Sequence, residues 1–158
     1  MDTYQSYTET KDQCQTVVAI GNFDGLHRGH RALLRAAKNV ADSRGLDWAV
    51  LTFSPHPAQV LAPAHAPKAI MTVREKVAAF EALGLKKVWI QNFTMAFAQL
   101  SPEAFVSDVL LAGLGAHHVV VGFDFCFGQN RSGNVAVLQA LLATRNIGLT
   151  VVDAVEDS

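Results

Sequence analysis

A chain of 158 residues is long enough for one compact domain with a sizeable core. Half of its residues are hydrophobic, 17% are charged and the formal net charge is −1, which excludes a disordered chain and a basic surface built for a nucleic-acid backbone. Two cysteines are too few for a disulfide framework, and no run approaches the ~18 apolar residues that span a bilayer. We therefore expect a cytoplasmic protein whose partners include neither nucleic acid nor membrane.

The first elements follow a polar beginning. Residues 1–15 are polar and lack the apolar centre of a signal peptide, so we expect them to precede a single domain at residues 16–158. The β-branched run TVVAI at residues 16–20 predicts a buried parallel strand. Apolar residues then recur at three- and four-residue steps over residues 28–44, which predicts an amphipathic helix.

The second strand is predicted at residues 47–53 (DWAVLTF), and the segment 54–67 that follows it contains four prolines. We expect an irregular loop there, and a loop of this length in a compact domain is usually functional. Thr72 and Glu75 have the spacing of a capping box, which predicts a helix over residues 73–83.

The same alternation continues to the end of the chain. We predict strands at residues 87–93, 117–121 and 148–153, with one helix that begins at Ser101 and another over residues 133–144. Alternating strands and helices imply right-handed crossovers. The expected fold class is therefore α/β, with three layers: a five-stranded parallel sheet and helices on both of its faces.

Three loops of this fold should meet. Residues 21–30, 53–67 and 122–134 each follow the carboxyl end of a predicted strand. Open parallel sheets bind their ligands beyond those ends, so we expect the three loops to lie on one edge of the sheet and to form the ligand site.

The most informative motif is GNFDGLHRGH at residues 21–30, between the first strand and the first helix. His27 and His30 are three residues apart, so both imidazoles emerge on one face of the first helical turn. The unpaired N–H groups and the positive dipole end of a helix favour an anion at that place. Gly25 and Gly29 would let a nucleotide approach the backbone. The motif therefore predicts a site for phosphate groups.

Other interpretations of the two histidines stay open. Such a pair also occurs on a solvated helix face, and with His56 as a third ligand it would begin a zinc site. The motif lacks both the Gly-Lys-Ser/Thr of a Walker loop and the glycine spacing of a dinucleotide fingerprint, which disfavours a kinase or a dehydrogenase.

Three blocks of the sequence resemble one family. GNFDGLHRGH resembles the HxGH motif of nucleotidyltransferases, and its first five residues are similar to those of the prokaryotic FAD synthetases. TFSPHP at residues 52–57 resembles the next block of that family, and GFDFCFG at 122–128 with RSG at 131–133 resembles the third. The blocks occur in the family's order, and the resemblance covers about residues 16–153. It implies a Rossmann-like nucleotidyltransferase fold.

The resemblance also implies a reaction and a set of residues. FMN phosphate would attack the α-phosphorus of ATP, so that FAD forms and pyrophosphate leaves, with Mg²⁺ carried on ATP because the sequence shows no carboxylate cluster to hold a metal. His27 and His30 would be the catalytic pair that stabilises phosphate charge. The nucleotide would contact Gly21, Asn22, Phe23, Asp24, Gly25 and Gly29. The flavin would contact Phe53, His56, Pro57, Leu61, Asp124 and Phe127.

Some of these residues also fit simpler roles. Phe53 and Phe127 are equally compatible with ordinary core positions, and His56 between two prolines is as well suited to fix its loop by a hydrogen bond as to contact a substrate. We take Phe127 as the best single candidate for a contact with the flavin ring.

Two features depart from the family pattern. Family members commonly have a basic or hydroxyl residue at the position of Cys126 and often aspartate at that of Asn134. They also continue with a Ser-Ser-Thr-x-x-Arg segment that contacts phosphate, and usually with a riboflavin kinase domain, neither of which lies in residues 1–158. We therefore expect no riboflavin kinase activity. Two alternatives remain: an impaired fragment that binds nucleotide or flavin, and a nucleotidyltransferase for another small phosphate, such as a phosphopantetheine or glycerol phosphate.

Overall fold

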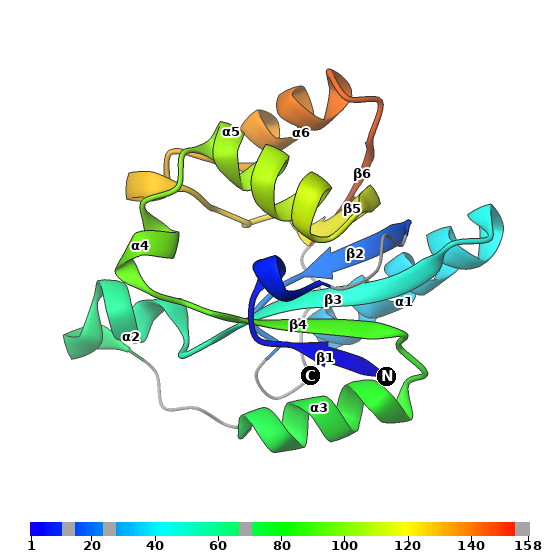
Figure 1. Ribbon diagram of the computed structural model, residues 1–158, viewed down its shortest axis with the longest axis horizontal. Coiled ribbons are helices and arrows are strands. Elements are labelled where there is room, and N and C mark those ends of the chain that lie inside the picture. Colours follow the sequence, from blue (N-terminus) through cyan, green and yellow to red (C-terminus); the bar gives the residue numbers. More distant parts are fainter. Residues whose placement is uncertain (11–14, 24–27, 67–70, 154–158) are drawn as a thin grey trace.

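Six parallel strands form one sheet in the order β1-β4-β3-β2-β5-β6 (Figure 1). The computed structural model describes residues 1–10, 15–23, 28–66 and 71–153. Within these ranges the strands are β1 (Asp2–Tyr4), β2 (Thr16–Ile20), β3 (Asp47–Ser54), β4 (Lys87–Asn92), β5 (Ala116–Gly122) and β6 (Gly148–Val152).

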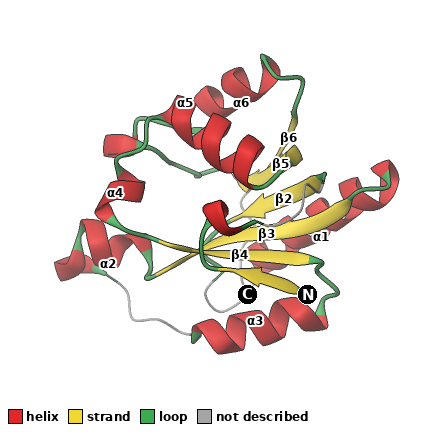
Figure 2. Ribbon diagram, in the orientation of Figure 1, coloured by secondary structure: helices red, strands yellow, loops and turns green. Residues whose placement is uncertain are grey.

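Helices cover both faces of the sheet (Figure 2). The α-helices are α1 (Arg28–Arg44), α2 (Pro57–Leu61), α3 (Val73–Ala82), α4 (Met95–Ala98), α5 (Pro102–Ala104) and α6 (Val135–Ala143). A π-helix, η3 (Phe105–Gly113), continues α5, and the short 3-10 turns are η1 (Tyr7–Glu9), η2 (Pro63–His65) and η4 (Gln129–Arg131). No helix in the described ranges has both the length and the apolar composition needed to cross a bilayer.

The central strand β2 shows how the core is divided. All five of its residues are buried, and successive side chains of a strand point to opposite faces. Val17 and Ala19 pack in the cluster formed with α1 and α3, whereas Val18 and Ile20 pack in the cluster formed with η3 and α6. A strand covered on both faces is apolar throughout, which is why this run could be recognised in the sequence.

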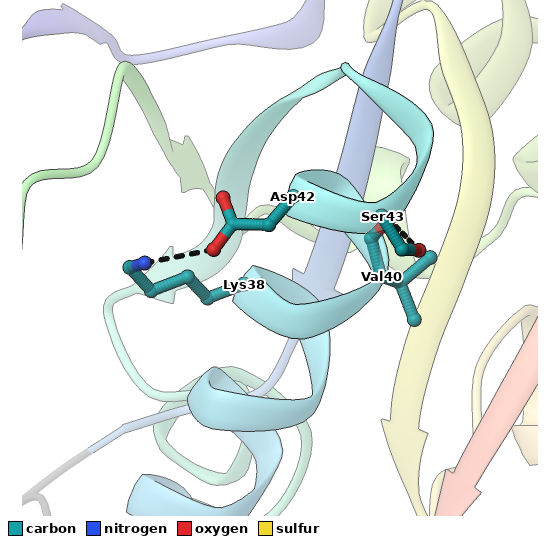
Figure 3. Close-up of polar contacts among 4 residues, drawn as sticks. All are labelled: Lys38, Val40, Asp42 and Ser43. Carbon is teal, nitrogen blue, oxygen red and sulfur yellow. Dashed lines mark hydrogen bonds and ion pairs between the residues drawn. The ribbon is translucent and has the colours of Figure 1, made fainter.

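Local capping and surface pairing define the helices. Thr72 and Glu75 form the predicted capping box, with each side chain accepting the other residue's backbone N–H at 3.1 Å. On the outer side of α1, Lys38 Nζ lies 2.9 Å from Asp42 Oδ2, and Ser43 Oγ donates to the carbonyl of Val40 at 2.9 Å (Figure 3). Exposed pairs of this kind contribute only ~0.3–0.5 kcal/mol, so burial of the opposite side of α1 dominates its stability.

The predicted number of strands was wrong, because the polar N-terminal segment contributes the sixth. Asp2 pairs with Lys87, and Tyr4 pairs with Trp89 and stacks on its ring at a centroid distance of 5.5 Å. Trp89 Nε1 also donates to Thr10 Oγ1 at 2.8 Å. β1 is only three residues long and has no apolar run, so nothing in the sequence indicated it. It forms because the edge of β4 is available for pairing.

Two other segments differ from the expectation. The proline-rich segment 54–67 is partly ordered into α2 and η2, because Pro57 and Pro63 each occupy a first helical turn, where a missing N–H costs nothing. The helix expected after Ser101 does begin there, with Ser101 Oγ accepting the N–H of Ala104 at 3.1 Å. It then widens into the π-helix η3, for which we have no physical account.

Candidate functional site

A cavity of about 1020 Å³ lies beyond the carboxyl ends of the strands. Ile20, Phe53, Gly122 and Val152, each at or next to the end of a strand, line its floor. The rest of the lining comes mainly from the loops that follow β2, β3, β4 and β5. The prediction that the loops at residues 21–30, 53–67 and 122–134 meet at one edge is confirmed, because each of them contributes to this cavity.

Buried side chains of β3 and α3 hold the loop that follows β2. The backbone carbonyl of Asn22 accepts hydrogen bonds from Thr52 Oγ1 at 3.0 Å and from Lys76 Nζ at 2.9 Å. Gly21 donates its N–H to the carbonyl of Leu51 at 3.2 Å. Asn22 Oδ1 is buried, and within the described part of the chain no donor reaches it. Buried polar atoms are normally hydrogen-bonded, so the Asn22 amide is suited to a polar ligand in the cavity.

Phe23 lies beneath this loop, on the core side. Its side chain is fully buried, and its ring meets that of Phe80 edge to face at 5.7 Å. Gly21 makes room for it, since a Cβ on Gly21 would lie 3.1 Å from the Phe23 ring. The ring of His30 lies 5.3 Å from the same ring. Phe23 therefore supports the loop and His30, and its side chain is not among those that line the cavity.

The predicted nucleotide residues are only partly described. Gly21, Asn22 and His30 line the cavity together, and Gly29 lies in the first turn of α1. The predictions for Asp24, Gly25 and His27 fall outside the described residues.

All six predicted flavin residues line the cavity: Phe53, His56, Pro57, Leu61, Asp124 and Phe127. His56 does so while also capping α2, because its Nδ1 accepts the N–H of Ala58 at 3.0 Å. The two roles that the sequence left open for His56, fixing its loop and facing the cavity, are thus both compatible with its position.

Phenylalanines form one wall of the cavity. Phe53 meets Phe93 edge to face at 5.8 Å, and Phe105 packs on Phe127 at 5.0 Å. Phe127 is only 7% exposed: Phe125 stacks on it at 5.4 Å, and a Cβ on Gly133 would come within 2.6 Å of its ring. Phe127 is therefore mainly a packing residue behind the cavity surface. Phe125 is the more exposed ring of the stacked pair.

Sequence reasoning missed Met95 on the rim and did not assign Phe123, which belongs to the third family block, to a ligand. Met95 and Phe123 line the cavity although both are large apolar residues with more than half of their surface exposed. Exposed apolar side chains beside a cavity are typical of a binding surface. A usable signal existed, since both residues lie just after the carboxyl ends of predicted strands. Arg131, whose left-handed backbone has φ of 53°, is a further lining residue; the sequence placed it in the third family block without assigning it a ligand.

The charged and metal-binding groups of the site are few. Among the described residues that line the cavity, three are charged: Asp124, Arg131 and Asp153. No three His, Cys, Asp or Glu side chains come together as metal ligands anywhere in the described ranges.

Comparison with known proteins agrees with this geometry. Residues 9–158 match the family model described as FAD synthetase. Among curated relatives, the bifunctional riboflavin kinase/FMN adenylyltransferase of Bacillus subtilis (strain 168) is 36% identical over 137 residues, 86% of this chain and 43% of the relative. The enzyme of that description from Listeria monocytogenes is 40% identical over 138 residues, 87% of this chain and 43% of the relative. The chain thus spans less than half the length of these relatives.

Solved structures share the fold. A macrolide-efflux protein from Streptococcus pneumoniae superposes with a TM-score of 0.83 at 24% identity, over 99% of this chain and 52% of the other. Pantoate-beta-alanine ligase from Francisella tularensis, in complex with beta-gamma ATP and beta-alanine, superposes with a TM-score of 0.62 at 14% identity, over 99% of this chain and 68% of the other. These likenesses show a shared fold, and the predicted α/β architecture with a parallel sheet between helices is confirmed.

Proposed function

This chain belongs to the FAD synthetase family, and we propose that it transfers the adenylyl group of ATP to the phosphate of FMN, which produces FAD and pyrophosphate. The observation that carries the proposal is the continuity of the cavity. One end has a loop and helix start of the kind that binds phosphate, and the other has an aromatic wall of the kind that binds a flat ring system.

The size of the cavity supports two ligands. Pockets for one drug-sized molecule measure roughly 300–1,000 Å³. The present cavity, at about 1020 Å³, is slightly larger than the upper end of that range. It therefore offers space for a nucleotide at the end formed by Gly21, Asn22 and His30, with a flavin beside it along Phe53 and Phe125.

The proposed chemistry needs positioning and charge stabilisation from the protein. The FMN phosphate would attack the α-phosphorus of ATP, and pyrophosphate would leave from the opposite side. His30, and His27 as the sequence predicts, would donate hydrogen bonds to the phosphate oxygens on which charge accumulates. ATP would carry the Mg²⁺ that neutralises its phosphates, which agrees with a described lining that has only scattered carboxylates. We propose the cytoplasm, where ATP and FMN are available, as the location.

A direct test measures product formation. The purified chain is incubated with ATP, Mg²⁺ and FMN, and FAD and pyrophosphate are quantified by chromatography and a coupled assay. We expect both products in equal amounts. FMN binding without FAD formation would favour a binding module, and adenylyl transfer to phosphopantetheine or a nucleotidyl transfer to glycerol phosphate, with FMN inert, would favour a different nucleotidyltransferase.

A further inference from the structure

Two side chains that are distant in sequence converge on one backbone carbonyl. Thr52, in β3, and Lys76, in α3, both donate to the carbonyl of Asn22, at 3.0 and 2.9 Å. Thr52 is fully buried and Lys76 is only 9% exposed. Burying an ammonium group is costly unless it is hydrogen-bonded, so a lysine at this place indicates more than packing.

The two bonds determine which way the next N–H points. The peptide unit between Asn22 and Phe23 is planar and trans, so its N–H and its C=O point in opposite directions. Because the carbonyl points toward the buried Thr52 and Lys76, the N–H of Phe23 points away from them. Asn22 lines the cavity, whereas Phe23 is fully buried and is not among the lining residues, so the group that the two bonds hold beside a ligand is the side-chain amide of Asn22.

Helix α3 holds this peptide unit at two points. Lys76 and Phe80 are four residues apart and so lie on the same face of α3. Lys76 bonds the carbonyl of Asn22, while Phe80 packs edge to face against the ring of Phe23 at 5.7 Å. Phe23 has a left-handed backbone with φ of 50°, which is uncommon for an aromatic residue and persists only where its surroundings enforce it.

We propose that Lys76 is a positioning residue for the nucleotide. By holding the Asn22 carbonyl, it directs the side-chain amide of Asn22 toward the phosphate groups, and it places a positive charge next to the loop. Such preorganised donors are effective because they need no reorientation when the ligand arrives. Lys76 does not itself line the cavity and acts through Asn22. The inference rests on the proposed function, in that it takes the ligand at this end of the cavity to be a nucleotide.

Removal of the ammonium should affect one ligand and spare the other. Lys76→Met keeps an aliphatic stem in the buried position and removes only the charged donor. We expect the affinity for α,β-methylene-ATP, an analogue that cannot transfer its adenylyl group, to fall about tenfold, which is typical for the loss of a charged hydrogen bond. The affinity for FMN should stay unchanged, because Lys76 is not among the residues that line the cavity.

Three further variants separate positioning from general stability. Arg74→Met removes the same charge from an exposed position of the same helix and should leave both affinities unchanged. Lys76→Arg retains a cationic donor and should restore most of the nucleotide affinity. Thr52→Val removes the second donor to the same carbonyl with little change of shape. The effects of Lys76→Met and Thr52→Val should be non-additive, because both bonds hold one peptide unit.

The measurements are calorimetric titrations with α,β-methylene-ATP and with FMN, ¹H–¹⁵N spectra in which the Asn22 side-chain amide is assigned, and thermal unfolding. In the unsubstituted protein the Asn22 side-chain amide signal should shift on addition of the analogue, and in Lys76→Met this shift should be reduced. Unchanged analogue affinity in both Lys76→Met and Thr52→Val overturns the inference, as does an amide that ignores the analogue. So does an equal loss of affinity for the two ligands.

The outcome is separable from that of the proposed function. A protein that shows the amide shift and its dependence on Lys76 but forms no FAD contradicts the proposed function and supports the inference. If the unsubstituted protein forms FAD and Lys76→Met has the same analogue affinity and the same KM for ATP, the inference is wrong and the proposed function stands. Should Lys76→Met fail to fold, Thr52→Val provides the same comparison.

Discussion

The position of the His30 ring depends on a buried phenylalanine of the preceding loop. Phe23 packs against His30 on one side and against Phe80 on the other, at 5.3 and 5.7 Å between ring centroids. The residue that faces the cavity is thus supported by two residues that do not line it. The division into facing and supporting residues makes their substitutions distinguishable.

Substitution of His30 should remove activity with little effect on the fold. We expect His30→Ala to slow FAD formation by about 10²-fold or more, because a preorganised donor to the phosphates is lost. The midpoint of thermal unfolding should change little. Arg35→Ala, an exposed position of the same helix, serves as the control. Unchanged turnover in a folded His30→Ala protein would contradict a phosphate role for this residue.

Replacement of two phenylalanines that line the cavity by alanine should affect different properties: stability for Phe127 and FMN binding for Phe123. Phe127 is 7% exposed, so Phe127→Ala should lower the free energy of unfolding by about 3–5 kcal/mol, as in other cores. Phe123 is 56% exposed, so Phe123→Ala should leave stability within about 0.5 kcal/mol. If Phe123 contacts the flavin, its loss should weaken FMN binding up to about tenfold, as expected for one aromatic contact.

Urea denaturation and FMN fluorescence titration measure the two effects. An FMN affinity that is unaffected by Phe123→Ala would place the ring of the flavin elsewhere in the cavity. Equal stability losses in the two variants would show that the exposure of Phe123 does not persist in solution.

At the scale of elements, the pair β5 and β6 contains a group sensitive to pH. His118 in β5 shares a 2.7 Å hydrogen bond between its Nε2 and Thr150 Oγ1 in β6. Its ring packs so closely on Gly148 that a Cβ there would lie 2.5 Å from Nδ1. Burial, and secondarily the guanidinium of Arg44, lower the pKa of His118 below its ordinary value of 6.5.

Acidification should therefore weaken this end of the sheet. The unfolded chain takes up a proton on His118 as the pH falls through about 6.5, whereas the folded protein does so only at lower pH. The neutral His118 ring therefore contributes fully to stability above pH 6.5, and this contribution is lost as the pH falls from 6.5 toward the lowered pKa of the folded protein. Urea denaturation at pH 7.5 and 5.5 should show a larger loss for the unsubstituted protein than for His118→Gln. Equal losses would contradict a depressed pKa.

At the scale of the whole molecule, the N-terminal segment closes one edge of the sheet. β1 covers the edge of β4, and the N–H of Tyr7 donates to Gln91 Oε1 at 2.8 Å. Open strand edges favour pairing with other chains. Deletion of residues 1–10 should therefore lower the midpoint of thermal unfolding and promote self-association.

Thermal unfolding and size-exclusion chromatography test this expectation, with Asp2→Asn as a control at an exposed position of β1. A shortened protein that stays monomeric and equally stable would show that β4 does not need the added strand. The cavity lies at the carboxyl ends of the strands, and none of residues 1–10 lines it. FMN binding should therefore persist wherever the shortened protein is folded.

The sequence by itself determined what depends on neighbouring residues. The apolar run of β2, the periodicity of α1 and the capping box of Thr72 are local patterns, so they were recognised without knowledge of the fold. Their alternation sufficed to predict a parallel sheet and the edge at which the three loops meet. The cavity-lining positions of His30, His56 and Phe53 follow from that edge.

Only the tertiary structure decided the contacts between distant residues. β1 has no pattern of its own and exists because β4 offers an edge 85 residues away in the register Asp2 to Lys87. Phe23 belongs to the motif predicted to bind the nucleotide, yet its ring points into the core, where it packs against Phe80. Lys76 has no local pattern that distinguishes it from other helix lysines, and only folding brings its ammonium to the carbonyl of Asn22, 54 residues earlier. Burial and hydrogen-bond partners across such distances are set by packing, which local periodicity does not encode.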